Sequence, residues 1–445
     1  MFRFINVVIA IVVLVLAAGV HAEGMAEPMT LEQAITIALA QNPQFQTATL
    51  SIEQAEHRYQ AAEADFFPKV GTSYTYTRLN EEPRIKAPAG SFYPERINAV
   101  IGTQNIYRWD LHLVQPLFTG GQIYQSYKLE ALGVDVAKLR RDIARNELIY
   151  SVKSAYFTLL KTQKLRDVAR QAVEQITAHE KTARDFFEQE MIAKNDLLEA
   201  QVRLAQAQQD LVRAEQSVAI AQAAFNTVLH QEVNQPVVIT DIGDDHHQGL
   251  SLAESHSHAL QHQPVIREID TIIEQAHTAV KLAQSTYFPK VFLASSYLRQ
   301  GNQAEVRGTQ YEDAEAWNVS LNLDWTFWEW GKKRHIVGEQ RAKLLQAQET
   351  KKEIVDKVLL QVTDAWLRCE ENWKNIGVSR TALAQAEENF RIYKNRFDQQ
   401  MATTTDVLDA QTLLTKAYAN YHTARYDYYI ACSALEFAIG DVKNF

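Results

Sequence analysis

The sequence predicts a mixed α/β membrane protein in which each chain adds a few β-strands to a shared barrel and extends it with very long α-helices. Three features of the 445 residues predict this class. The chain repeats itself over most of its length, two long segments lack proline, and short segments alternate between apolar and polar side chains. A period near 3.6 indicates helices, and a period of 2 indicates strands.

An internal repeat divides the chain into two copies of one unit. The sequence Phe-Pro-Lys-Val occurs at 67–70 and again at 288–291, a shift of 221 residues. We assign repeat 1 to 31–230, repeat 2 to 252–440 and an equatorial linker to 231–251. Duplicated units of this kind bury their apolar faces against one another. At a later shift of 210, the matched pairs include Leu111 and Leu321, Gly121 and Gly331, Phe187 and Phe397, Met191 and Met401, and Asp196 and Asp406.

The first 22 residues resemble a secretory signal peptide. Arg3 supplies a positive charge, residues 7–20 form a run of fourteen without a polar side chain, and residues 20–22 fit a cleavage site. Fourteen residues are too few for a membrane-spanning helix, although an uncleaved membrane anchor is the alternative interpretation. We therefore expect export and a mature chain, residues 23–445, that forms one protomer.

Composition and motifs exclude several classes of function. The formal net charge is −9, and removing residues 1–22 leaves 44 basic against 54 acidic residues, or −10. An acidic chain argues against nucleic acid as a partner. No nucleophile-and-base pattern, phosphate loop or zinc-enzyme motif is found in the sequence. We therefore expect neither an enzyme nor a bound cofactor.

Histidines cluster between 246 and 262, where His258 and His262 stand four residues apart. That spacing places two side chains on one face of a helix, as in a pair of metal ligands. No cysteine or compact set of carboxylates completes a site nearby, so a solvated surface is the favoured interpretation and no metal site is assigned.

Cys369 and Cys432 lie 31 or 32 residues on either side of a predicted turn at 400–401. In an antiparallel helical hairpin they stand at the same height. A disulfide, in the oxidising periplasm, and two unpaired thiols packed as small apolar groups both fit this placement. The matching positions of repeat 1 are Leu159 and Gln222, one apolar and one polar, and they leave both interpretations open.

Very long helices are predicted where proline is absent, since proline and glycine are the costliest residues inside a helix. No proline occurs between 117 and 235 or after 289. A helix of about 66 residues is ~100 Å long, far longer than a globular domain needs. The expected long helices are 122–188 and 195–229, with a turn near Glu190, and 332–397 and 405–438, with a turn near Met401. The expected short helices are 31–41, 44–65, 252–261 and 265–286.

Four strands are predicted, two in each repeat. Residues 317–327 and 107–113 alternate strictly between apolar and polar, and 70–77 and 291–298 are their expected partners. Aromatic side chains near the ends of an apolar strand face are typical of transmembrane barrels, although a half-buried sheet in a soluble protein has the same alternation. Because about eight strands are needed to close a small barrel, several chains must share one. The expected lipid-facing aromatics are Tyr107, Trp109, Trp317, Trp325 and Phe327.

Ordered, duplicated motifs make the chain resemble the TolC-like outer membrane factors of the outer membrane efflux protein family. The similar segments are the opening helix 31–43, the strand start at 67–68, the hinge at 115–121, and the tip motifs 195–200 and 406–411. The resemblance implies a homotrimer whose 12-stranded transmembrane barrel, with four strands per chain, continues as a long periplasmic α-helical coiled-coil barrel.

The same resemblance implies a passive exit duct in the outer membrane. Its partners would be outer membrane lipid, a periplasmic adaptor (membrane fusion) protein and an inner-membrane transporter, in a tripartite efflux pump or a type I secretion system. The alternative function is a soluble periplasmic coiled-coil scaffold.

The tips of the hairpins depart from the family pattern. The family usually has a glycine six residues before the tip aspartate, where this chain has Glu190 and Gln400. The best-known member ties its tip shut with a tyrosine and an arginine, and the matching positions here are Phe397 and Ala402. The resemblance therefore implies that this latch is absent or differently built.

Asp406 and Asp409 stand three residues apart and share one helix face. By resemblance, the matching acids ring the periplasmic entrance as a gate. The alternative is that Asp406, like Asp196, caps the start of its helix, and Thr403 with Asp406 reads as a capping box. The candidate adaptor-docking residues at the tips, for which local turn packing is the alternative, are Ile192, Ala193, Asn195, Asp196, Met401, Ala402 and Thr403.

Overall fold

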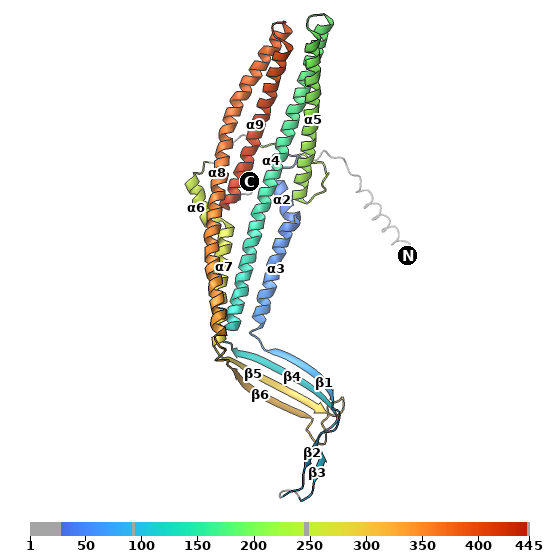
Figure 1. Cartoon of the computed structure of the whole chain (residues 1–445), viewed down its shortest axis with the longest axis vertical. Helices are drawn as coiled ribbons and strands as arrows, with labels where there is room; N and C mark the ends of the chain where they lie inside the picture. Colours follow the sequence, from blue (N-terminus) through green and yellow to red (C-terminus); the bar gives the residue numbers. More distant parts are fainter. Residues whose placement is uncertain (1–27, 91–93, 244–248, 443–445) are drawn as a thin grey trace, which may run out of the picture. The chain divides into compact units, whose positions relative to one another are not determined.

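The computed structural model describes residues 28–90, 94–243 and 249–442, so the predicted signal peptide at 1–22 lies outside the described residues. The chain forms two compact units, and each draws on both sequence repeats. The hairpin unit comprises Met1–Thr47, Asp142–Gln263 and Asp356–Phe445, as far as these ranges are described. The sheet unit comprises Ala48–Arg141 and Pro264–Val355 and carries the strands (Figure 1).

Four long helices confirm the predicted hairpins to within one residue at each end. α5 returns alongside α4, and α9 returns alongside α8 (Figure 1). The absence of proline from these segments allows an unbroken ladder of backbone hydrogen bonds. The bounds are Gln122–Glu188 for α4, Lys194–Leu229 for α5, Lys332–Asp398 for α8 and Thr404–Ile439 for α9.

Short helices precede the sheet strands in each repeat, as predicted. Thr30 and Ser251, which match at a shift of 221, each cap a helix in a capping box with Gln33 and Glu254 respectively. Pro43 and Pro264 open the next helices, where a missing N–H costs nothing. The bounds are Leu31–Gln41 for α2, Pro43–Ala64 for α3, Leu252–His262 for α6, Pro264–Gln284 for α7 and Ser285–Tyr287 for the 3-10 turn η2.

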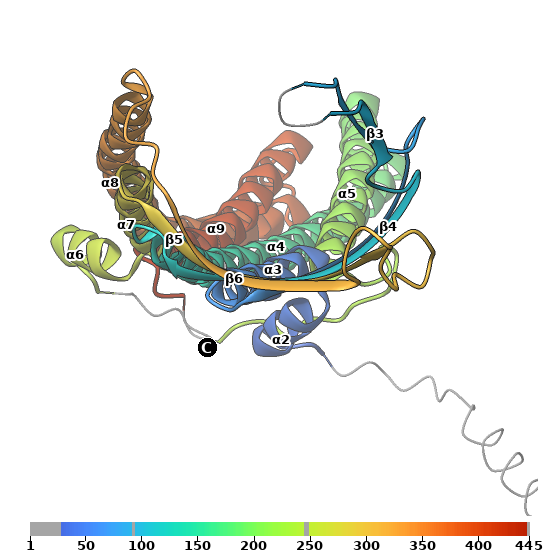
Figure 2. The same ribbon diagram turned by 90° about the horizontal axis from the view of Figure 1, so that it is seen from below.

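The four predicted strands form one antiparallel sheet, which is curved in end view (Figure 2). The order is β1-β4-β5-β6, so β4 of repeat 1 pairs with β5 of repeat 2 at the centre, and β1 and β6 form the two edges. Neither edge has a further strand partner among the described residues. The bounds are Lys69–Arg78 for β1, Asn105–Phe118 for β4, Lys290–Gly301 for β5 and Glu315–Asp324 for β6.

Two strand predictions need correction. Between β1 and β4, where no strand was predicted, the chain forms a further hairpin, β2 (Arg84–Ala87) and β3 (Ile97–Val100), so the described residues hold six named strands. The strand predicted at 317–327 ends at Asp324, whose partner is Lys290. Pro289, the residue before Lys290, has no N–H to continue the ladder. Trp325 and Phe327 therefore follow the strand.

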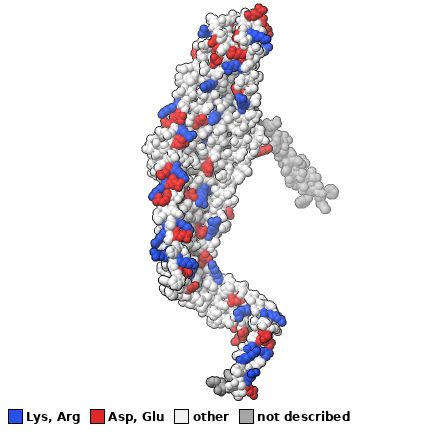
Figure 3. Space-filling model, in the orientation of Figure 1, with Lys and Arg blue, Asp and Glu red and all other residues white. Residues whose placement is uncertain are grey.

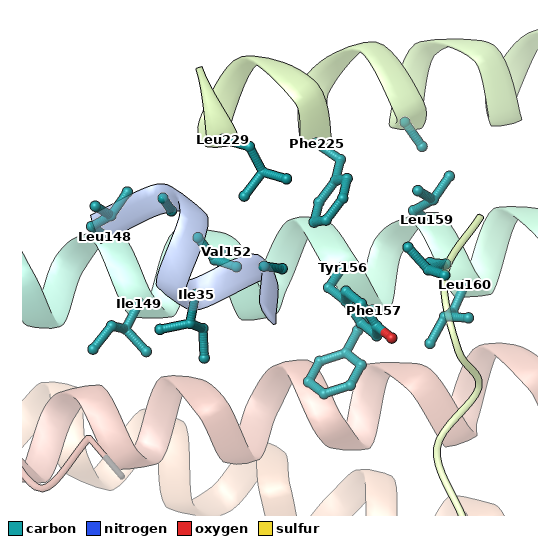
Figure 4. Close-up of a cluster of buried hydrophobic side chains, with 14 of the residues drawn as sticks. Ile35, Leu148, Ile149, Val152, Tyr156, Phe157, Leu159, Leu160, Phe225 and Leu229 are labelled. Carbon is teal, nitrogen blue, oxygen red and sulfur yellow. The ribbon is translucent and has the colours of Figure 1, made fainter. Parts of the chain in front are cut away.

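The core of the hairpin unit lies where α2, α4 and α5 meet (Figure 4). Ile35, Val152 and Phe225 are buried there with Leu229. Tyr156 donates a hydrogen bond of 2.6 Å to the carbonyl of Thr240, which ties part of the linker to this core. Apolar burial at this level thus holds the first hairpin together.

A disulfide joins Cys369 of α8 to Cys432 of α9, with the two Cα atoms 5.3 Å apart. Of the two interpretations that the sequence left open, the structure has the disulfide. The bond lies in a small cluster with Ile376 and Tyr428. The second hairpin is thus covalently fixed at the level where repeat 1 has Leu159 in its apolar core.

Candidate gate, docking tips and membrane face

Each hairpin ends in the same backbone turn. Met191 donates its N–H to the carbonyl of Phe186, and Met401 donates to Arg396, at 2.8 and 2.7 Å. Glu190 and Gln400, at the position where the family usually has glycine, adopt φ values of 58° and 60°. This left-handed conformation is the one that glycine adopts without cost at a helix C-terminus.

Asp406 caps the start of α9, as the alternative interpretation predicted. Its carboxylate accepts hydrogen bonds from the Thr403 N–H at 2.9 Å and the Thr403 hydroxyl at 2.8 Å, and the Asp406 N–H donates to that hydroxyl. These bonds from Thr403, with help from the charge of Arg396, lower the pKa of Asp406 below its usual value. In repeat 1 only half of this arrangement exists, because Ala193 has no hydroxyl and donates only its N–H to Asp196.

Asp409 lies three residues beyond Asp406 and leaves 65% of its side chain exposed. Its carboxylate is 3.8 Å from the guanidinium of Arg203 on α5. Nearby, the Thr405 hydroxyl donates to the Glu199 carboxylate at 3.0 Å. These contacts tie the tip of α9 to α5. Sequence reasoning missed Arg203, Glu199 and Thr405, because only the spatial pairing of two distant helices reveals them.

At the turns, the side-chain amide of Gln400 lies 3.2 Å from the sulfur of Met191, which adds another contact between the two hairpins. The predicted docking residues all lie at these turns and the helix starts beside them. Exposed positions are Ala193, Asn195, Met401 and Thr403, and half-buried ones are Ile192, Asp196 and Ala402.

Phe397, which the resemblance matched to a latch tyrosine, is buried and only 3% exposed. Its ring packs 4.7 Å from the imidazole of His179 and 5.5 Å from the ring of Phe186, measured between centroids. Burial lowers the pKa of His179 to about 4. No pattern in the sequence pointed to His179, whose role depends on the packing of α4 against α8.

The sheet has one apolar and one polar face. Directly paired residues point to the same side, and the register places Trp109 beside Tyr74, and Tyr297 beside Trp317. The predicted aromatics Tyr107, Trp109 and Trp317 share this face with Leu321, which is exposed. Trp325 and Phe327 lie just beyond its end.

The opposite face of the sheet carries polar groups that bond to one another. Asp110 accepts a hydrogen bond of 2.7 Å from the Ser296 hydroxyl and lies 2.8 Å from Nδ1 of His112. The His112 ring lies over Gly71, where a Cβ would be 2.4 Å from Nε2. A sheet with one apolar and one polar face suits a wall between lipid and water.

The histidines of α6 contact α8 and one another. His256 is hydrogen-bonded at 3.0 Å to the Thr363 hydroxyl, and the rings of His258 and His262 stack 5.4 Å apart. No group of three potential ligands occurs in the described part of the chain, and His246 and His247 lie outside it.

Basic side chains (Lys and Arg) and acidic side chains (Asp and Glu) are intermixed along the helices on the face drawn in Figure 3. Among the helices that the structure describes, none has the length and apolar character needed to cross a bilayer.

A family model described as outer membrane efflux protein matches residues 34–229 and 256–441. The chain belongs to the outer membrane efflux protein family. Membership confirms the resemblance drawn from the tip and hinge motifs, and it decides against the soluble scaffold in favour of an outer-membrane exit duct for efflux or secretion.

Named relatives of this outer membrane efflux protein span nearly its whole length. The outer membrane efflux protein BepC of Brucella suis is 21% identical over 415 residues, covering 92% of this chain and 85% of BepC. The alkaline protease secretion protein AprF of Pseudomonas aeruginosa is 23% identical over 417 residues, covering 91% and 83%.

Solved structures show the same fold. The outer membrane protein VceC from Vibrio cholerae has a TM-score of 0.77 at 17% identity and covers 92% of this chain and 96% of its own. The Campylobacter jejuni CmeC outer membrane channel has a TM-score of 0.77 at 17% identity, covering 92% and 85%.

Proposed function

We propose that this outer membrane efflux protein is one of three identical protomers that together form a passive exit duct. The observation that carries the proposal is the four-stranded sheet, whose edges β1 and β6 have no further strand partner in the described chain and whose apolar face is exposed. Unpaired strand edges and exposed apolar surface are both costly for a separate chain. Pairing β6 of one copy with β1 of the next removes the edges, and three copies supply twelve strands.

Exposed apolar side chains on the long helices support the same assembly. On α8, Leu360 and Leu367 are seven residues apart, and Val378 and Ile392 are fourteen apart. Such spacing is typical of a coiled-coil seam. The exposed apolar residues of α5 are Leu198, Val202, Val212 and Ile220. We assign these faces to contacts between neighbouring protomers in a periplasmic helical barrel.

The gate lies at the tips of the helices. Three copies bring six carboxylates, from Asp406 and Asp409, to one axis, where they attract cations. Opening separates the second hairpin from the first, which breaks the contacts of Asp409 with Arg203 and of Thr405 with Glu199. The exposed tip residues, such as Met401, then meet a periplasmic adaptor that links the duct to an inner-membrane transporter. BepC is named for efflux and AprF for protease secretion, so we assign the choice of cargo to the transporter.

The test begins with the full-length chain expressed in a Gram-negative host and fractionated. We expect it in the detergent-extracted outer membrane, with the mass of a trimer by light scattering, and we expect conductance in planar bilayers. Release of a monomer with the soluble periplasmic proteins would contradict the proposal. Asp409→Ala should then lower cation selectivity without lowering the amount of trimer, and unchanged selectivity would remove Asp409 from the gate.

A further inference from the structure

The segment from Trp325 to His335, between β6 and the first turn of α8, combines exposed aromatic rings with cations. Trp325, Phe327, Trp328 and Trp330 are all exposed, and Trp330 most of all at 88%. The indole of Trp325 donates to the carbonyl of Tyr287, and the rings of Trp328 and Trp330 lie 5.8 Å apart. We call residues 325–335 the aromatic–cation segment.

Trp330 has an unfavourable backbone conformation. Its φ is +48°, in the left-handed region, and its counterpart in repeat 1 is Gly120 with φ +64°. Glycine adopts this conformation freely, whereas a residue with a Cβ does so at a cost. The Trp330 side chain is almost fully exposed, and the ring it lies beside, that of Trp328, is exposed as well. A strained and exposed tryptophan is a reason to look for a partner.

The cations have an unfavourable position as well. Lys332, Lys333 and Arg334 occupy the first turn of α8, where the helix dipole disfavours positive charge. Lys332 lies 3.8 Å from Glu329, Lys333 donates to the carbonyl of Thr326, and Arg334 is exposed. In repeat 1 the corresponding residues 122–124 are uncharged. Two local costs in one short segment of repeat 2 point to an anionic partner.

We propose that the aromatic–cation segment binds the anionic headgroup of a glycerophospholipid at the periplasmic surface of the outer membrane. The inference rests on the proposed function, since the sheet must lie in the bilayer. The segment directly continues the exposed apolar face of β6 from Leu321 and Leu323. Tryptophan rings favour the boundary between headgroups and acyl chains, and lysine and arginine pair with lipid phosphate.

The test measures which phospholipid stays bound to the full-length trimer. The protein is reconstituted in phosphatidylcholine with one quarter phosphatidylglycerol and re-extracted in mild detergent, and the retained lipids are counted by native mass spectrometry. We expect enrichment of phosphatidylglycerol in the wild type. Combining Lys332→Gln, Lys333→Gln and Arg334→Gln should reduce the enrichment by about fivefold for each cation that contacts phosphate. Lys343→Gln, an exposed cation further along α8, is the matched control and should change nothing.

Trp330→Gly separates the aromatic contribution from folding. It restores the residue of repeat 1 and relieves the backbone, so loss of lipid with a normal trimer yield supports the inference. Equal retention of both lipids by the wild type, or unchanged enrichment in the triple variant, would overturn it. If trimer mass and conductance are normal in these samples, the proposed function survives that failure. Cross-linking of Trp330→Cys to a second copy would instead make the segment a subunit interface and would also overturn the lipid site.

Discussion

The ring of Phe397, in the last turn of α8, packs 4.7 Å from the imidazole of His179 on α4, centroid to centroid. His179 Nε2 is buried without a hydrogen-bond partner in the described structure. A cavity of about 380 Å³ lies beside this pair, lined in part by Glu174, Lys394 and Asp398. Phe397, which the resemblance matched to a latch tyrosine, thus makes a ring contact between the two hairpins.

This contact should make the tips sensitive to acid. Burial lowers the pKa of His179 to about 4, and Lys394 also lowers it, while Asp398 raises it. The packed state therefore favours neutral imidazole, so stability is complete above about pH 6.5 and falls as the pH drops toward 4. The total loss is on the order of 3 kcal/mol. Thermal unfolding between pH 7 and pH 4 should show this loss in the wild type.

His179→Phe keeps an aromatic ring but cannot titrate, so most of this pH dependence should disappear in that variant. His258→Asn, on the exposed part of α6, is the matched control and should behave like the wild type. A wild type and a His179→Phe variant with the same pH profile would show that His179 does not couple packing to pH.

Capping of α9 and gating should depend on different residues at the tip. Thr403→Ala removes the N-cap hydroxyl and should destabilise the protein by about 1 kcal/mol. Asp409→Ala removes only an exposed ion pair at 3.8 Å, so its effect on stability should stay below ~1 kcal/mol while cation selectivity changes. Urea unfolding measures the first effect and bilayer reversal potentials measure the second. A large loss of stability in Asp409→Ala, without one in Thr403→Ala, would show that Asp409 stabilises the fold and would contradict its assignment to the gate.

The disulfide should stabilise the second hairpin. Cys369 and Cys432 are 63 residues apart, and closing a loop of that length is worth about 4 kcal/mol in the chain-entropy view. Replacing both with serine should lower the urea midpoint of the full-length protein, and reducing the wild type should lower it equally. Ser379→Ala, in the same helix, is the comparison variant. A reduced wild type as stable as the oxidised one would contradict this prediction.

The strained turns should tolerate glycine. Gln400 has a φ of 60°, and Gln400→Gly should stabilise the turn by up to about 1 kcal/mol, because glycine adopts this conformation without steric cost. Lys394→Gly, inside α8, should instead destabilise the protein by about 1 kcal/mol. Thermal unfolding distinguishes the two signs. Loss of stability in Gln400→Gly would mean that the contact of the glutamine with Met191 outweighs the backbone strain.

Local signals predicted the elements well. The absence of proline predicted the long helices, and strict alternation of apolar and polar residues predicted strands of the sheet. The β2–β3 hairpin was missed because its strands are only four residues long and lie among Pro83, Pro88 and Pro94, which favour loops.

Contacts between helices that are distant in the sequence could not be predicted from local sequence patterns. Arg203 and Asp409 are 206 residues apart, and only the relative rotation and height of α5 and α9 bring them together. The same holds for His179 and Phe397. The capping alternative for Asp406 is confirmed, and the sequence could indicate it because a capping box involves residues only three apart. Spacing placed the two cysteines at one height but could not say whether they face one another.

The open edges of the sheet are not interchangeable, since β1 belongs to repeat 1 and β6 to repeat 2. In the proposed barrel, joining copies edge to edge therefore has a direction, and every joint uses one edge of each kind. A chain with a blocked β1 and a chain with a blocked β6 still complement each other at a single seam, yet any ring containing either is left with a gap. Even in small amounts, such a chain would prevent copies of the intact protein from closing a ring.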